Sequence, residues 1–131
     1  MGAAGLTSSS IEMASKGNLG IEIDLTKVPC REEKMSPYEI MLSESQERML
    51  IILEEGKENE AKKIFDKWNL DFAVIGKTTD SKNIELFFKN EKVAEIPIDF
   101  LAENAPMYDR KWTKAKLPKE SKFSISIKRP K

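Results

Sequence analysis

Hydrophobic and polar residues follow one another along the chain in patterns that predict both strands and helices. Apolar residues alternate with Glu22 and Asp24 across residues 20–25, which is typical of a half-buried strand. The unbroken apolar run at residues 49–53 predicts a strand over residues 48–53 that is covered on both faces and is therefore central in its sheet. Three more strands are predicted at residues 72–76, 84–88 and 92–96, the last two joined as a hairpin.

Helix signals lie between these strands. Apolar residues from Ala61 to Trp68 recur at helical spacing and predict an amphipathic helix over residues 57–68. The sequence Ser36-Pro37-Tyr38-Glu39 has the form of a capping box with proline at the first helical position, and it predicts a short helix through Leu42. Two further helices are predicted, one capped within residues 7–10 and ended at Lys16 by Gly17, the other over residues 98–104.

The order of these elements indicates an α+β fold. We expect a mixed, largely antiparallel sheet of about four to five strands with helices packed on it. The large side chains of Tyr38 and Trp68 are expected in the core. Residues 1–106 are predicted to form the folded domain, and residues 107–131 a basic linker or tail.

Charge is distributed unevenly, although the 131 residues carry 22 basic and 22 acidic side chains. Residues 107–131 hold nine of the basic and two of the acidic side chains, so the tail is basic and the body acidic. A basic tail suits nucleic acid, but this one lacks arginine clusters and interleaved aromatic residues, which favours a solvated linker and no nucleic-acid partner. No apolar run reaches the roughly 18–20 residues of a membrane span, and the N-terminal residues do not have the pattern of a secretory signal.

Few residue types for catalysis are present. The chain has no histidine, and Cys30 is its single cysteine, so we assign no catalytic residue and no metal ligand within it. Chemistry near neutral pH would need carboxylates, lysines or groups from outside the chain. A lone cysteine fits a reducing compartment, and we expect a cytoplasmic location. Glu32 and Glu33 are expected to be solvated.

Two polar segments are candidates for binding. The first is the loop Gly2-Ala3-Ala4-Gly5, followed by a helix with Thr7 and three serines. Glycine lets a ligand approach the backbone closely, the helix N-terminus offers N–H donors, and serine hydroxyls add more, so phosphate is the natural ligand. A tight turn before a capped helix explains the same pattern. The second segment, residues 41–48, includes Glu44-Ser45-Gln46, which suits a polyol such as ribose or, alternatively, a polar connection.

The strings that carry these segments resemble a known family. They are MGAAGLTSSS at residues 1–10, EMA at 12–14, PYE at 37–39, MLSESQERM at 41–49 and AENAP at 102–106. Together they are similar to the phosphoribosylformylglycinamidine synthase large subunit, in the C-terminal part of its first synthase-like half, within the aminoimidazole ribonucleotide synthase-like superfamily. The resemblance runs to about Trp112 and implies the fold of that C-terminal domain.

The resemblance also implies a function in purine biosynthesis. The family's ligase converts formylglycinamide ribonucleotide, ATP and glutamine-derived ammonia to formylglycinamidine ribonucleotide, ADP and phosphate, with Mg²⁺. Glu44, Ser45 and Gln46 match its substrate-binding triplet, and Gly2, Ala3, Ala4 and Gly5 match its phosphate loop. A magnesium-binding aspartate precedes the position of Met1 in the family, where catalytic histidines and ATP contacts also lie upstream.

The implied partners follow from that comparison. They are an upstream ATP-site domain, a downstream synthase-like half, a glutaminase subunit and a small bridging subunit. The isolated chain is expected to be inactive. Two alternatives remain: a stand-alone, non-catalytic phosphate- or nucleotide-binding module with the same fold, and another superfamily member related to selenophosphate synthase or thiamine phosphate kinase.

Overall fold

One mixed sheet organises the computed structural model, which describes residues 1–44, 47–102, 104 and 106–115. Within these residues the sheet has the strand order β2-β1-β3-β4, with β1 parallel to β3 and the other neighbours antiparallel. The predicted α+β class is therefore confirmed. The strands are β1 (Gly20–Asp24), β2 (Gly76–Thr79), β3 (Asn83–Phe88) and β4 (Glu91–Pro97).

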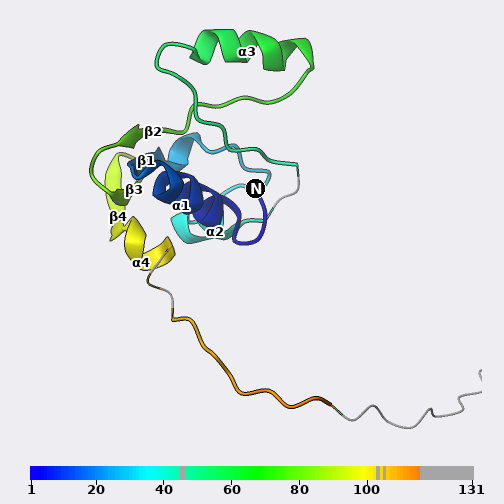
Figure 1. Ribbon diagram of the computed structural model, residues 1–131. Helices are drawn as coiled ribbons and strands as arrows, with labels where there is room; N and C mark the ends of the chain where they lie inside the picture. Colours follow the sequence, from blue (N-terminus) through cyan, green and yellow to red (C-terminus); the bar gives the residue numbers. More distant parts are fainter. Residues whose placement is uncertain (45–46, 103, 105, 116–131) are drawn as a thin grey trace, which may run out of the picture.

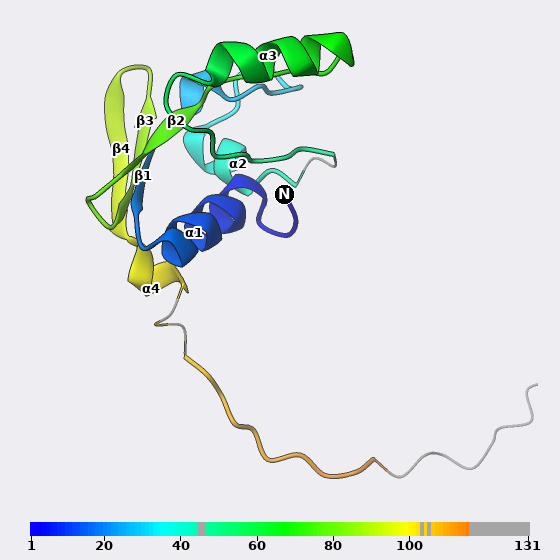
Figure 2. The ribbon, with the colours of Figure 1, turned by 45° about the horizontal axis from the view of Figure 1, so that its top comes forward.

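Helices cover one face of this sheet (Figures 1 and 2). They are α1 (Gly5–Gly17), α2 (Pro37–Leu42) and the short α4 (Ile98–Ala102). The alternation predicted for residues 20–25 is confirmed, because Ile21 and Ile23 of β1 face the helices and are buried. A single turn of 3-10 helix follows at Leu25–Lys27. The core consists of Leu6, Ile11, Ala14, Ile21, Ile23, Leu25, Val28, Ile40, Met41, Ile84, Leu86 and Ile98.

The opposite face of the sheet is polar and carries ion pairs, two of them between neighbouring strands and one within β4. Lys92 Nζ lies 2.6 Å from a carboxylate oxygen of Glu85 and 2.9 Å from one of Glu95, and Lys77 pairs with Glu22 at 3.3 Å. The hydrogen bonds to Glu85 and Glu95 raise the pKa of the Lys92 amine. Exposed pairs of this kind stabilise a fold little, so the helix-covered face holds the sheet together.

Helix α1 begins earlier than its serines and threonine predict. Its N-cap is Ala4, in the left-handed region at φ 57°, and its C-cap is Asn18 at φ 51° rather than Gly17. The prediction of a cap within residues 7–10 was wrong because the chain reverses direction before those residues. In α2, by contrast, the predicted capping box is confirmed: Ser36 Oγ accepts from the Glu39 amide, and Glu39 Oε2 accepts from the Ser36 amide.

The predicted central strand at residues 48–53 was wrong. These residues form no strand, and Ile51 is 50% exposed. The predicted strand at residues 72–76 was misplaced, since β2 starts at Gly76. Both segments instead lead to and from α3 (Glu58–Lys67), which projects from the rest of the molecule (Figure 1). Residues 48–75 therefore form an excursion, a name kept below for this segment.

The excursion explains why two aromatic residues are not in the core. The helix predicted at residues 57–68 is confirmed as α3, and Phe65 stacks on Phe72 with ring centroids 5.2 Å apart. Trp68, however, is 67% exposed, because α3 stands away from the sheet. Tyr38 lies on the outer side of α2 and is 75% exposed. The prediction that both side chains are core residues was wrong.

Residues 106–115 leave the body beyond α4 without helix or strand (Figure 1). Tyr108 and Trp112 are exposed there. The division into a domain at residues 1–106 and a tail at 107–131 stays a prediction. Across the described residues, no helix has both the length and the apolar character needed to cross a membrane.

Replacing Ile23 and Ile51 separately should show that β1, and not the segment at residues 48–53, contributes to the core. Ile23 is fully buried, so Ile23→Ala should lower the free energy of unfolding by about 2–5 kcal/mol. The matched change Ile51→Ala, at a half-exposed position in the excursion, should cost less than about 1 kcal/mol. Urea unfolding followed by circular dichroism measures both. Equal losses would contradict the position of Ile51 outside the core.

The capping box should contribute to acid sensitivity. Hydrogen bonds from the Ser36 side chain and backbone lower the pKa of Glu39 below its ordinary value of 4.5. A lowered folded-state pKa means that the ionised form stabilises the fold above the unfolded-state pKa, and that this contribution is lost as the pH falls through the folded-state pKa. Urea midpoints measured from neutral to acidic pH should therefore fall less for Glu39→Gln than for the original chain. The exposed control Glu33→Gln should leave the slope unchanged.

Candidate functional site

The glycine loop and the segment after α2 meet at one end of the molecule. The Ala4 amide donates a hydrogen bond to Glu44 Oε1 at 2.7 Å, and the Met1 nitrogen donates to the Arg48 carbonyl at 2.6 Å. Figure 1 shows the N-terminus beside the chain that follows α2. Two segments about forty residues apart in sequence, both selected as binding candidates, are therefore in direct contact.

Gly5 makes this close approach possible. It is buried, its φ is +53°, and a Cβ added to it would lie closer than 3.0 Å to the Ser43 carbonyl oxygen. Both the left-handed backbone and the space at this position suit glycine and no other residue. Gly2 differs, since a Cβ there would meet nothing within 4 Å. The sequence pattern indicated a glycine-dependent loop, but it did not show which glycine touches the second segment.

The helix pair α1 and α2 holds the two segments together. Thr7 Oγ1 donates to the Met41 carbonyl at 2.9 Å, so the first turn of α1 is tied to the last turn of α2. The Ser43 amide donates to the Glu39 carbonyl at 2.9 Å, which carries the chain directly from the end of α2 toward the loop. The buried contacts of Leu6 and Met41 therefore place Glu44 at the glycine loop.

Glu44 is the predicted triplet residue that the structure describes. Its side chain is exposed, and its Oε1 accepts from Ala4 while its Oε2 makes no hydrogen bond with the described residues. The predicted residues Ser45 and Gln46 lie outside the described residues. The contact between Glu44 and the loop Gly2–Gly5 agrees with one shared site, while the binding roles of all seven residues stay predictions.

The serine hydroxyls after the loop are used differently from what their sequence suggests. Ser8 Oγ donates to the Ala3 carbonyl, Ser9 Oγ to that of Gly5, and Ser10 Oγ to that of Leu6. Ser10 is fully buried. These hydroxyl protons stabilise the first turns of α1, so the donors facing a ligand would be backbone amides rather than hydroxyls.

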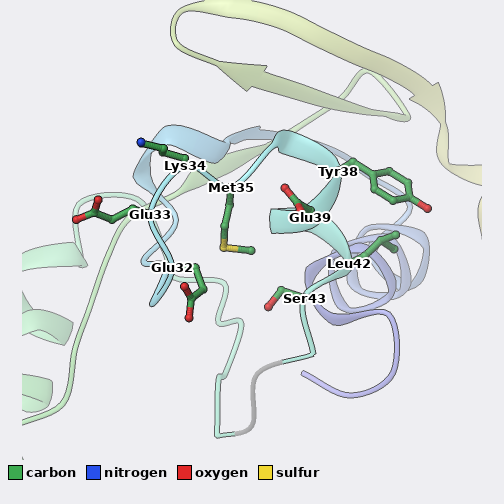
Figure 3. Close-up of a pocket in the computed structure, with 8 residues that line it drawn as sticks. All are labelled: Glu32, Glu33, Lys34, Met35, Tyr38, Glu39, Leu42 and Ser43. Atoms are coloured by element: carbon green, nitrogen blue, oxygen red, sulfur yellow. The ribbon is translucent and has the colours of Figure 1, made fainter.

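A hollow of about 470 Å³ lies beside this site (Figure 3). Met35 points into it, between the loop that carries the exposed Glu32 and Glu33 and the helix α2. Glu32 and Glu33 are exposed, as predicted, and they also line this open hollow. It adjoins the glycine-loop site through Ser43. Its lining consists of Glu32, Glu33, Lys34, Met35, Tyr38, Glu39, Leu42 and Ser43.

The described residues do not make a magnesium site. No group of three or more Asp, Glu, His or Cys side chains is placed to hold a metal ion in the described part of the chain. At the glycine loop the near carboxylate is that of Glu44, which already accepts from the Ala4 amide. Mg²⁺ prefers an octahedral set of oxygen ligands, so the residues present here do not fit it.

Comparison with known proteins identifies related chains. Residues 1–89 match the family described as AIR synthase related protein, C-terminal domain. The chain is 81% identical over 122 residues to the phosphoribosylformylglycinamidine synthase subunit PurL of Pelagibacter ubique, covering 93% of this chain and 17% of that protein. It is 64% identical over 112 residues to the PurL subunit of Zymomonas mobilis, covering 86% of this chain and 15% of that protein.

Solved structures agree with these sequence relatives. T. maritima PurL complexed with FGAR superposes with a TM-score of 0.77 at 37% identity, covering 90% of this chain and 20% of that one. The same protein complexed with ATP gives a TM-score of 0.76 at 37% identity, over 89% of this chain and 20% of that one. The resemblance seen in the sequence is thus confirmed. The chain spans less than a fifth of the length of the curated relatives named here.

Substitution of the loop glycines should separate the one that contacts the second segment from the one that does not. Gly5→Ala places a Cβ against the Ser43 carbonyl in a left-handed conformation, whose cost alone is roughly 1–2 kcal/mol. Thermal unfolding should therefore show a clearly lower Tm for Gly5→Ala and an unchanged Tm for Gly2→Ala. A Gly5→Ala chain as stable as the original would contradict the close contact.

Proposed function

Because this chain belongs to the family described as AIR synthase related protein, C-terminal domain, we propose that it forms the ribonucleotide-binding part of a phosphoribosylformylglycinamidine synthase. The observation that carries the proposal is the contact between Glu44 and the glycine loop, in a chain 81% identical to a PurL subunit over 122 residues. The structural relative complexed with FGAR supports a ribonucleotide as the ligand.

In this proposal the whole enzyme joins nitrogen to a formylglycinamide ribonucleotide. ATP supplies the energy, glutamine supplies ammonia, and formylglycinamidine ribonucleotide, ADP and phosphate are the products. The described residues contribute binding and orientation. They include no histidine and no metal-ligating cluster, so the groups that hold ATP and Mg²⁺ would come from other parts of the enzyme.

Two features of the site suit a sugar phosphate. The Oε2 of Glu44, which makes no hydrogen bond with the described residues, can accept one from a ribose hydroxyl, and Ser45 and Gln46 follow Glu44 in the sequence with two more polar side chains. The first turn of α1 has no acidic side chain, and no side chain of the described residues caps it. The amides of Ala4, Gly5 and Thr7 already donate hydrogen bonds within the protein, so the positive end of the helix dipole is what favours an anion at the Gly2–Gly5 loop.

The proposal also covers partners and location. An upstream ATP-site domain and a downstream synthase-like half would complete the large subunit, and a glutaminase subunit and a small bridging subunit would complete the assembly. The structure of PurLQS from Thermotoga maritima, with a TM-score of 0.76 at 35% identity over 89% of this chain and 20% of that one, supports further subunits. We place the enzyme in the cytoplasm, in keeping with the single cysteine of this chain.

The excursion fits a chain that works within a larger enzyme. Ile51, Ile64, Trp68 and Val74 are each close to half exposed or more. Apolar side chains gathered on one projecting segment mark a contact surface in many proteins. In the proposed synthase, other parts of the large subunit would cover them.

The Glu44 carboxylate should set affinity for the ribonucleotide. In the full-length synthase, Glu44→Ala should raise the KM for formylglycinamide ribonucleotide by about tenfold or more, because a hydrogen bond to a charged group contributes roughly 1.5–3 kcal/mol. Steady-state kinetics measures this effect, and circular dichroism checks that the fold is intact.

The matched control is Glu33→Ala, which removes a carboxylate from the neighbouring hollow and should leave the KM unchanged. A wild-type kinetic profile for Glu44→Ala would refute the binding role. Calorimetry on the 131-residue chain tests the alternative function. Tight binding of the ribonucleotide without turnover would favour the stand-alone binding module.

A further inference from the structure

The side chain of Arg48 contacts the backbone of Ser43. The guanidinium of Arg48 donates from Nη2 to the Ser43 carbonyl, five residues earlier in the chain. Between them Glu47 has a φ of 63°, in the left-handed region that non-glycine residues seldom adopt. Such a conformation persists where the surrounding contacts fix it. The Arg48 side chain is one of those contacts.

The backbone of Arg48 is also attached to the glycine loop. Its carbonyl accepts from the Met1 nitrogen at 2.6 Å, and Arg48 is half-buried. One residue therefore contacts both sides of the site, through its side chain to Ser43 and through its carbonyl to the start of the glycine loop. The Ser43 carbonyl that it contacts is also the group packed against Gly5.

Glu44 follows Ser43 directly, so its reach depends on how Ser43 is held. Its own side chain is exposed and has a single described contact, the 2.7 Å bond from the Ala4 amide. An exposed glutamate side chain loses rotamer entropy when it is fixed. Fixing the Glu44 backbone costs conformational entropy as well. A Ser43 carbonyl that is already held reduces this second cost, because it keeps the backbone of Glu44 close to the loop.

We propose that Arg48 is a positioning residue, whose guanidinium binds the Ser43 carbonyl and so holds the Glu44 carboxylate against the Ala4 amide. Its importance for the ribonucleotide rests on the proposed function, but the positioning itself is a property of this chain. Arg48 touches no ligand in this role. It acts through the Ser43 carbonyl.

The test uses the 131-residue chain and two long, unbranched replacements. Arg48→Lys keeps a donor that reaches the Ser43 carbonyl, and Arg48→Met keeps the apolar stem without the donor. The amide proton of Ala4 is recorded by two-dimensional NMR as the pH is lowered through the titration of glutamate. In the original chain its chemical shift should follow the Glu44 carboxylate, and Glu44→Gln should abolish that dependence.

Arg48→Met should reduce the pH-dependent shift of the Ala4 amide by about threefold or more, because a hydrogen bond weakens steeply once it is misaligned. Arg48→Lys should retain most of the shift, and Arg31→Ala, at an exposed arginine outside the site, should retain all of it. The amides of Ile23 and Ile84 should not move in any variant, since both lie in the core.

Three results would overturn the proposal. The first is a pH-dependent chemical shift of the Ala4 amide that is as large in Arg48→Met as in the original chain. The second is an Ala4 chemical shift that is the same in the original chain and in Glu44→Gln. The third is an Arg48→Met chain that does not fold, because the guanidinium would then stabilise the fold as a whole. A failure of the proposed function appears elsewhere, as an unchanged KM for the ribonucleotide in the Glu44→Ala synthase.

Discussion

The close contact between Gly5 and the Ser43 carbonyl is the constraint on which the site depends. It brings the backbone of α1's first turn against the chain that leaves α2, at a distance that no side chain at position 5 permits. The Ala4–Glu44 bond and the Met1–Arg48 bond both lie across this contact. Without it, the two polar segments would be separate surface loops.

The rest of the fold serves to keep that contact in place. Leu6 of α1 and Met41 of α2 are buried over the sheet, where Ile23 and Ile84 support them. The parallel pair β1 and β3 lies at the centre of the sheet, and its buried side chains form the core with those of α1 and α2. Burial of roughly a dozen apolar side chains thus fixes the relative position of the two exposed candidate segments.

Several large apolar side chains lie outside the core, in the excursion. The excursion around α3 has its own small contact between Phe65 and Phe72, while Trp68 and Ile64 face outward. A helix can satisfy its backbone hydrogen bonds by itself, so α3 forms even where its apolar face has limited cover. In a synthase assembled from several parts, such a face is a natural place for contact with another part.

The sequence by itself determined the fold class, the capped helix α2, the amphipathic helix α3, the β3–β4 hairpin and the two candidate segments. These depend on local signals: a capping box, a period of 3.6 or 2, and turn residues. Its family resemblance also indicated Glu44 before any contact was known. The roles of Glu44, Ser45, Gln46 and the glycine loop remain proposals.

Tertiary structure decided what local patterns do not encode. The run at residues 49–53 has the composition of a central strand, but strand formation needs a neighbouring edge, and β1 pairs instead with β2 and β3. Trp68 lies on the apolar face of its predicted helix, but its side chain is buried only if another element packs against that face. The bond from the Ala4 amide to Glu44 and the bond from the Met1 nitrogen to the Arg48 carbonyl likewise follow from tertiary packing, because they join residues 40 and 47 positions apart.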